Sequence, residues 1–220
     1  MHYELRCHWY RNVARSPAGR LDGTPLLLNQ RVQDNRAAGR PRDPSIDERV
    51  FSVTRELLVE IGWDELSMRQ IAARSGVSRS SINRRWSSKA ELVLHAILGA
   101  TPDLDLFAGT DQRGWVDGVV RGSRELFARP EVRAAVPGLL LAMSENEQLR
   151  QRLWADFSGP AVGLFTAESS DGTVGEGDAR AVIAMAAGAA LFLSTIAAED
   201  DTDALHARIS GLLTRAVLGD

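Results

Sequence analysis

One stretch, from Ser67 to Leu92, constrains the chain more than any other. It has no Asp or Glu between Ser67 and Ala90, and it carries six Lys and Arg residues. Gly76 divides its first part into two short segments, and a residue that tolerates positive φ at such a place ends a helix. Two short helices around a tight turn, with a carboxylate-free basic surface, predict a helix-turn-helix unit that faces phosphates.

Charge is distributed unevenly around this unit. The chain has 220 residues and a net charge of −3, but residues 1–95 carry 16 Lys and Arg against 11 Asp and Glu, whereas residues 96–220 carry 10 against 18. The first half is therefore at +5 and the second at −8. Only the first half suits a nucleic acid, because phosphate binding depends on cationic side chains.

Cys7 is the single cysteine, so no intramolecular disulfide and no thiolate metal cluster is expected. The first residues lack the apolar core of a secretory signal, which favours a cytoplasmic protein. The uncharged run of 18 residues from Ala181 to Ala198 reaches the lower length limit of a membrane span. It is rich in small residues and closely flanked by charges, and we expect a buried or interface helix instead, with no membrane as partner.

The first 44 residues show no sustained period, and we interpret residues 1–44 as a mobile basic extension. Its end, Gly39-Arg40-Pro41-Arg42, could enter a minor groove as basic arms do, but a solvated leader without contacts is the favoured interpretation.

Four helices are expected next. The first starts near Ser45 and ends at Gly62; Ser67 and Ser78 are placed to cap the second and third. In the third, Ile82 and Trp86 lie four residues apart and should both point inward. A fourth begins after Ser88 and should run to Thr101-Pro102.

At these positions the chain resembles the DNA-binding domain of TetR-family transcriptional regulators. The matching pieces are Ser67-Met68-Arg69-Gln70-Ile71-Ala72, Gly76-Val77-Ser78, Ile82-Asn83-Arg84-Arg85-Trp86 and Ser88-Lys89-Ala90-Glu91-Leu92. The resemblance implies an all-α homodimer with a three-helix DNA-binding domain over residues 45–92. It also implies a larger helical domain over residues 93–220 for effector binding and dimerisation, and a palindromic double-stranded operator as target.

Polar residues of the second and third helices, and the start of the fourth, are the candidate DNA contacts. They are Ser67, Arg69, Ser78, Arg79, Ser80, Ser81, Asn83, Arg84 and Lys89. The family usually has Tyr where this chain has Asn83, and Asn can instead form paired hydrogen bonds with adenine. Lys89 resembles the family's phosphate clamp, whereas Arg85 and Trp86 are expected to serve packing.

The C-terminal half is expected to add five or six helices and no strands. Candidate effector-binding residues, each of which simple core packing would also explain, are Trp115, Val119, Met143, Trp154, Phe157 and Phe165. The resemblance further implies that the last two long helices form a four-helix interface across the dimer axis. Candidate interface residues are Gly188, Leu191, Phe192, Leu205, Ile209 and Leu212.

No HExxH, GxSxG, Walker loop or dinucleotide fingerprint is present, so neither an enzyme nor a cofactor or metal site is expected. The sequence thus predicts a DNA-binding protein, and the resemblance further implies a regulator, most simply a repressor, that a small molecule releases from DNA. The alternative is a helical adaptor of the same fold that no longer reads a DNA sequence.

Overall fold

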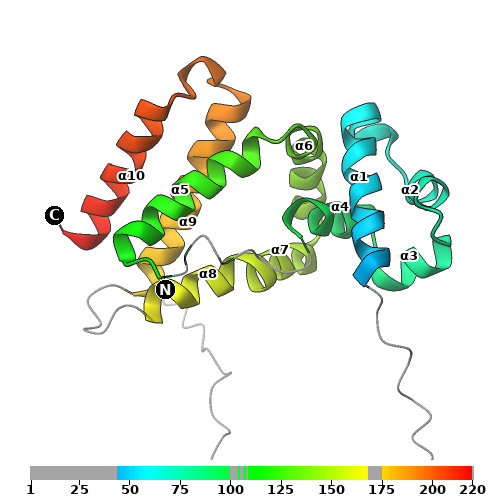
Figure 1. The fold of residues 1–220 in the computed structure, drawn as a ribbon, viewed down its shortest axis with the longest axis horizontal. Coiled ribbons are helices and arrows are strands. Elements are labelled where there is room, and N and C mark those ends of the chain that lie inside the picture. Colours follow the sequence, from blue (N-terminus) through cyan, green and yellow to red (C-terminus); the bar gives the residue numbers. More distant parts are fainter. Residues whose placement is uncertain (1–43, 100–103, 105–106, 108, 168–174, 220) are drawn as a thin grey trace, which may run out of the picture. The chain divides into compact units, whose positions relative to one another are not determined.

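A computed structural model describes residues 44–99, 104, 107, 109–167 and 175–219. Within these ranges the chain is helical and forms no strand, which confirms the expected all-α class. The proposed basic arm at residues 39–42 lies outside the described residues. In chain order the elements are α1 (Pro44–Glu65), α2 (Met68–Ser75), α3 (Arg79–Arg85), α4 (Lys89–Leu98), α5 (Gln112–Ala128), α6 (Pro130–Glu145), α7 (Glu147–Leu153), the π-helix η2 (Trp154–Ser158), α8 (Gly159–Ala167), α9 (Glu176–Thr195), the 3-10 helix η3 (Ala198–Asp200) and α10 (Asp203–Leu218) (Figure 1).

Local signals set the limits of the first helices as expected. Gly62, at φ 74°, interrupts the helical backbone of α1. The Ser67 hydroxyl accepts the backbone N–H of Gln70 at the start of α2, and Gly76 ends that helix at φ 67°. Ser78 caps α3 in the same way, by accepting the N–H of Ser81. These bonds satisfy backbone donors that the first turn of a helix leaves without partners.

The helix-turn-helix is held by a small apolar core. Ile82 is fully buried, and Trp86 packs on Phe51 of α1 with ring centroids 5.4 Å apart. Ile71 of α2 and Val77 of the turn are also buried in this cluster. One face of α3 is therefore fixed against α1 and α2, which turns the opposite face to solvent.

Helix α4 connects this unit to the rest of the described chain. Ser88 caps its start, and all its residues from Ala90 to Leu94, with Ala96 and Ile97, are buried. It ends at Leu98, before the expected Thr101-Pro102, because Gly99 has a φ of 89° and leaves the helical path. Figure 1 shows α4 between α1 and α6, and all three helices pack on one another.

Two apolar clusters hold the described residues together. The first combines buried residues of α1–α4 with residues of α6 and α7, among them Val132, Leu139 and Leu149. The second joins α5, α8, α9 and α10 around Trp115 and Phe165. The helix-turn-helix of α2 and α3 therefore shares its core with α6 and α7, so a displacement of α6 or α7 acts directly on the helices packed around it.

Candidate nucleic-acid interface

The six basic residues between Ser67 and Ala90 separate into two groups. The Arg74 guanidinium binds both carboxylate oxygens of Glu60, at 2.5 and 2.7 Å, and Arg85 is paired with Asp47 of α1. The hydrogen bond between Arg74 and Glu60 raises the pKa of Arg74 and lowers that of Glu60. Arg85 thus fastens α3 to α1, in agreement with its expected packing role.

Lys89 also has an internal partner. Its ammonium donates to the carbonyl oxygen of Trp63 at 2.8 Å and lies 4.5 Å from the centre of the Trp63 ring. Burial lowers the pKa of Lys89 below its ordinary value, although the Asp64 carboxylate opposes this shift. The carbonyl and the ring together hold the positive charge, so a phosphate contact by Lys89 requires it to leave this position.

The remaining cations, Arg69, Arg79 and Arg84, are exposed, and none forms an ion pair within the part of the chain that the structure describes. Asn83 and Ser80 are exposed beside Arg79 and Arg84 on α3. These four positions are one, three, four and five residues apart, and side chains three and four apart are neighbours on a helix surface. The result is an exposed polar surface that runs from beside the buried Ile82 to the opposite side of α3, and its Arg79, Asn83 and Arg84 side chains have no partner among the described residues.

The serines of this region are mostly bound to one another. Ser78 donates to the Ser81 hydroxyl at 2.9 Å and lies 3.1 Å from that of Ser80, while Ser67 is bonded to the Gln70 side chain at 2.6 Å. These hydrogen bonds stabilise the first turns of α2 and α3. Of the nine expected DNA contacts, the structure therefore brings Arg79, Asn83 and Arg84 together as free long donors, with Arg69 on α2.

This donor set has the chemistry of DNA recognition. Arg forms bidentate hydrogen bonds with guanine or with phosphate, and Asn does so with adenine. Asp47 is a residue that sequence reasoning missed: it lies 38 positions from Arg85, and no local period signals such a pair.

The expected effector residues do not gather in one place. A cavity of about 330 Å³ opens beside the start of α5, and it includes Trp115 and Phe165, whose rings are 4.5 Å apart. Met143 packs instead on the first apolar cluster, Trp154 lies beneath the Arg180 guanidinium, and Phe157 contacts His95. The described lining of the cavity consists of Leu104, Phe107, Gly109, Thr110, Asp111, Gln112, Trp115, Leu164, Phe165 and Ala167.

The expected interface residues are partly exposed. Gly188, Phe192 and Leu212 are exposed, Leu205 is half-buried, and Leu191 and Ile209 pack against the core clusters. Met185, and Ile196 at the C-cap of α9, extend this exposed apolar face, with Ile196 at 72% exposure. Among the described residues, α9 is also the one helix whose length and composition would allow it to cross a membrane.

A family model described as bacterial regulatory proteins of the tetR family matches residues 50–96. An uncharacterised HTH-type transcriptional regulator of Bacillus subtilis, YdeS, is 35% identical over 65 residues, which cover 30% of this chain and 33% of that protein. The chain thus matches about a third of the length of the first curated relatives. The DNA-binding transcriptional repressor TetR of Mycobacteroides abscessus is 29% identical over 133 residues, or 59% of this chain and 68% of that protein.

Solved structures share the fold. A TetR transcriptional regulator from Rhodococcus sp. RHA1 superposes with a TM-score of 0.58 at 16% identity, covering 78% of this chain and 93% of that one. The relatives are regulators and not enzymes. Residues 50–96 therefore match the tetR-family DNA-binding domain, and the described helices share the fold of a solved TetR transcriptional regulator.

Proposed function

We propose that this protein is a cytoplasmic transcriptional repressor that binds a palindromic operator as a homodimer and leaves it when a small molecule binds. The observation that carries the proposal is the solvent-facing donor surface of Arg79, Asn83 and Arg84 on α3. Residues 45–92 would form the DNA-binding domain and residues 93–220 the domain for effector binding and dimerisation, after a basic extension over residues 1–44.

Repression is supported by the relative from Mycobacteroides abscessus, which is described as a transcriptional repressor. Dimerisation is supported by the apolar face of α9 and its C-cap, where Met185, Phe192 and the capping residue Ile196 are all exposed. Exposed apolar side chains in one line on a helix mark an interaction surface. The negative net charge of residues 96–220 is consistent with a domain that does not contact DNA, because DNA phosphates repel it.

The cavity at the start of α5 is the proposed effector site. Its lining combines three aromatic rings with the polar side chains of Thr110, Asp111 and Gln112. Its volume of about 330 Å³ lies at the lower end of the range for small-molecule pockets. A small, largely apolar molecule fits this description.

Salt-dependent DNA binding tests the proposal. Duplexes enriched from a random pool by the wild-type protein supply the operator, and fluorescence anisotropy measures its affinity over a roughly sixfold range of salt, from about 50 to about 300 mM. We expect an inverted repeat and a steep loss of affinity with salt. Failure to enrich any duplex, or binding without sequence preference, would favour the adaptor alternative.

A matched pair of variants identifies the contacts. Arg84→Ala removes an unpaired exposed cation of α3, and Arg74→Ala removes a cation already bound to Glu60. If Arg84 contacts a phosphate, its variant lowers the slope of log affinity against log salt by about 1, while Arg74→Ala leaves the slope unchanged. Equal slopes for both variants and wild type would contradict the assigned surface.

A further inference from the structure

Helix α4 begins directly after the reading helix α3, with Trp86, Ser87 and Ser88 as the turn between them. Side chains from three later segments of the chain hold α4 along its length. At its start, Arg152 of α7 pairs with Glu91. At its middle, the Phe157 ring of η2 lies edge-on against His95, with ring centroids 6.0 Å apart. At its end, Arg129 donates to the Ile97 carbonyl oxygen at 3.0 Å.

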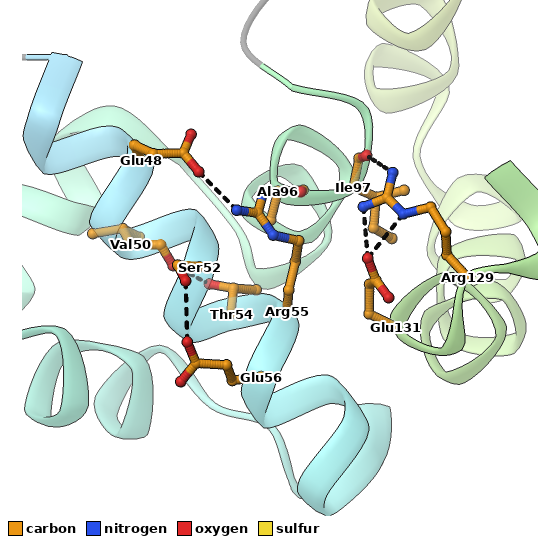
Figure 2. A network of polar contacts seen from close by, with 10 residues as sticks. All are labelled: Glu48, Val50, Ser52, Thr54, Arg55, Glu56, Ala96, Ile97, Arg129 and Glu131. Carbon is orange, nitrogen blue, oxygen red and sulfur yellow. Dashed lines mark hydrogen bonds and ion pairs between the residues drawn. The ribbon is translucent and has the colours of Figure 1, made fainter. Parts of the chain in front are cut away.

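The end of α4 is a helix terminus with orphan carbonyl groups, and two arginines satisfy them. Figure 2 shows Arg55 of α1 donating to the Ala96 carbonyl oxygen, at 2.9 Å, beside the Arg129 contact with Ile97. Cationic donors at this end of a helix also interact favourably with its dipole. The C-terminus of α4 is therefore anchored to both the DNA-reading unit and the junction of α5 and α6.

The start of α4 has a different arrangement, because its contact reaches the turn itself. Glu91 is only 7% exposed, and its carboxylate accepts the backbone N–H of Ser87 at 2.8 Å and the Ser87 hydroxyl at 2.5 Å. The other carboxylate oxygen accepts from Arg152. One buried side chain thus joins α7 to the residue that follows the C-terminal cap of α3, Trp86.

From this arrangement we propose that Arg152 is a positioning residue for DNA reading: through Glu91 it holds the Ser87 turn, and so the angle at which α3 presents Asn83 and Arg84. The inference rests on the proposed function, since it concerns the same reading surface. A nearly buried carboxylate keeps a fixed place only while its charge is compensated. When α7 moves away, Glu91 loses its cation and the turn loses its anchor.

The position of Arg152 in the chain suits such a role. It lies two residues before the π-helix η2. Such π-helical turns are rare in proteins, and those that occur are often found at functional sites. The same segment reaches α4 a second time through Phe157. A displacement of α7 and η2 therefore acts on α4 at two successive turns, which is how a change in the second half of the chain would reach the DNA-reading helix.

A double-mutant cycle tests the proposal. The variants are Arg152→Met, which keeps the apolar stem without the charge, Glu91→Gln, and the two together. Arg150→Met is the matched control, because Arg150 lies on the same helix but donates to Met143 within the later helices. Arg152→Lys tests whether a positive charge alone restores the effect.

Two measurements are made on each variant. Amide hydrogen exchange of residues 79–92 in the free protein reports on the turn without any DNA, and anisotropy reports the affinity for the enriched duplex. We expect Arg152→Met to speed exchange at Ser87 and in α3, and to weaken DNA binding by about 2- to 30-fold, the range found for residues that couple distant sites. The double variant should differ little from either single one, Arg152→Lys should recover part of the affinity, and Arg150→Met should match wild type.

The proposal is overturned if exchange at Ser87 and α3 is the same in wild type and Arg152→Met, or if the two single effects simply add. It is also overturned if Arg150→Met produces the same change, because the effect would then be a general loosening of α7. If the wild type enriches no duplex, the proposed function fails, whereas the exchange cycle still decides whether Arg152 holds the turn.

Discussion

Gly138 of α6 is the place where α6 approaches the DNA-reading unit too closely for any side chain. A Cβ at this position would lie 2.1 Å from the Nε1 and Cε2 atoms of the Trp63 indole. Ordinary carbon contacts are about 3.5 to 4 Å, so Gly138→Ala forces the indole or the backbone to move by about 1.5 Å. The indole is a rigid ring, and the Lys89 ammonium lies over it, so the ring cannot move away without also displacing Lys89.

We therefore expect Gly138→Ala to lower the free energy of unfolding by about 1 to 3 kcal/mol, the usual cost of overpacking a core. Urea unfolding followed by circular dichroism measures it. Gly163→Ala on α8 is the control, since a Cβ there meets nothing within 4 Å and an alanine in a helix gains up to about 1 kcal/mol. If Gly138→Ala is as stable as Gly163→Ala, the close approach of α6 to Trp63 is wrong.

Three further predictions concern other parts of the chain. Phe192→Glu places a charge at a site on α9 that is 51% exposed, and it should give monomers in analytical ultracentrifugation. Leu141→Glu, at a site on α6 that is 63% exposed, is the control and should leave the dimer intact. An unchanged dimer for Phe192→Glu would refute the interface. Asn83→Ala should change the order in which operator variants are preferred, by about 1 to 3 kcal/mol at an adenine it contacts, and an unchanged ranking in competition binding would exclude that contact. Burial alone would raise the pKa of Glu91, but hydrogen bonds from Ser87 and nearby positive charges outweigh it and leave the pKa lowered. Glu91 thus stabilises the fold at pH values above its ordinary pKa of 4.5. The difference in unfolding free energy between wild type and Glu91→Gln should shrink as the pH falls below that value. A difference that stays constant with pH would contradict a stabilising charge on Glu91.

The helix-turn-helix could be predicted from the sequence because its signals are local. Ser67, Ser78 and Ser88 each accept a backbone N–H three residues on, and Gly62 and Gly76 interrupt or end helices by adopting positive φ. A cap or a glycine acts on its own turn, so the sequence around it is sufficient evidence. The same holds for the four-residue spacing that turns Ile82 and Trp86 inward.

The expectations for the later helices were less specific because apolar periodicity identifies a buried face without identifying its partner. Trp115 and Phe165 meet beside a cavity, while Met143, Trp154 and Phe157 each pack elsewhere. All of these residues have the same apolar spacing on their helices. Which of them shares a cavity depends on how those helices are arranged in space.

The sequence by itself determined a basic stretch free of carboxylates, the helices that carry it and their resemblance to the tetR-family domain. Only the tertiary structure decided which of its charges are free to meet DNA. Arg85 and Lys89 are bound to groups 38 and 26 residues away, and Glu91 is held by an arginine 61 residues away. The physical reason is that a charge is available to a ligand only when no internal partner compensates it, and such partners are brought close by packing and not by sequence neighbourhood.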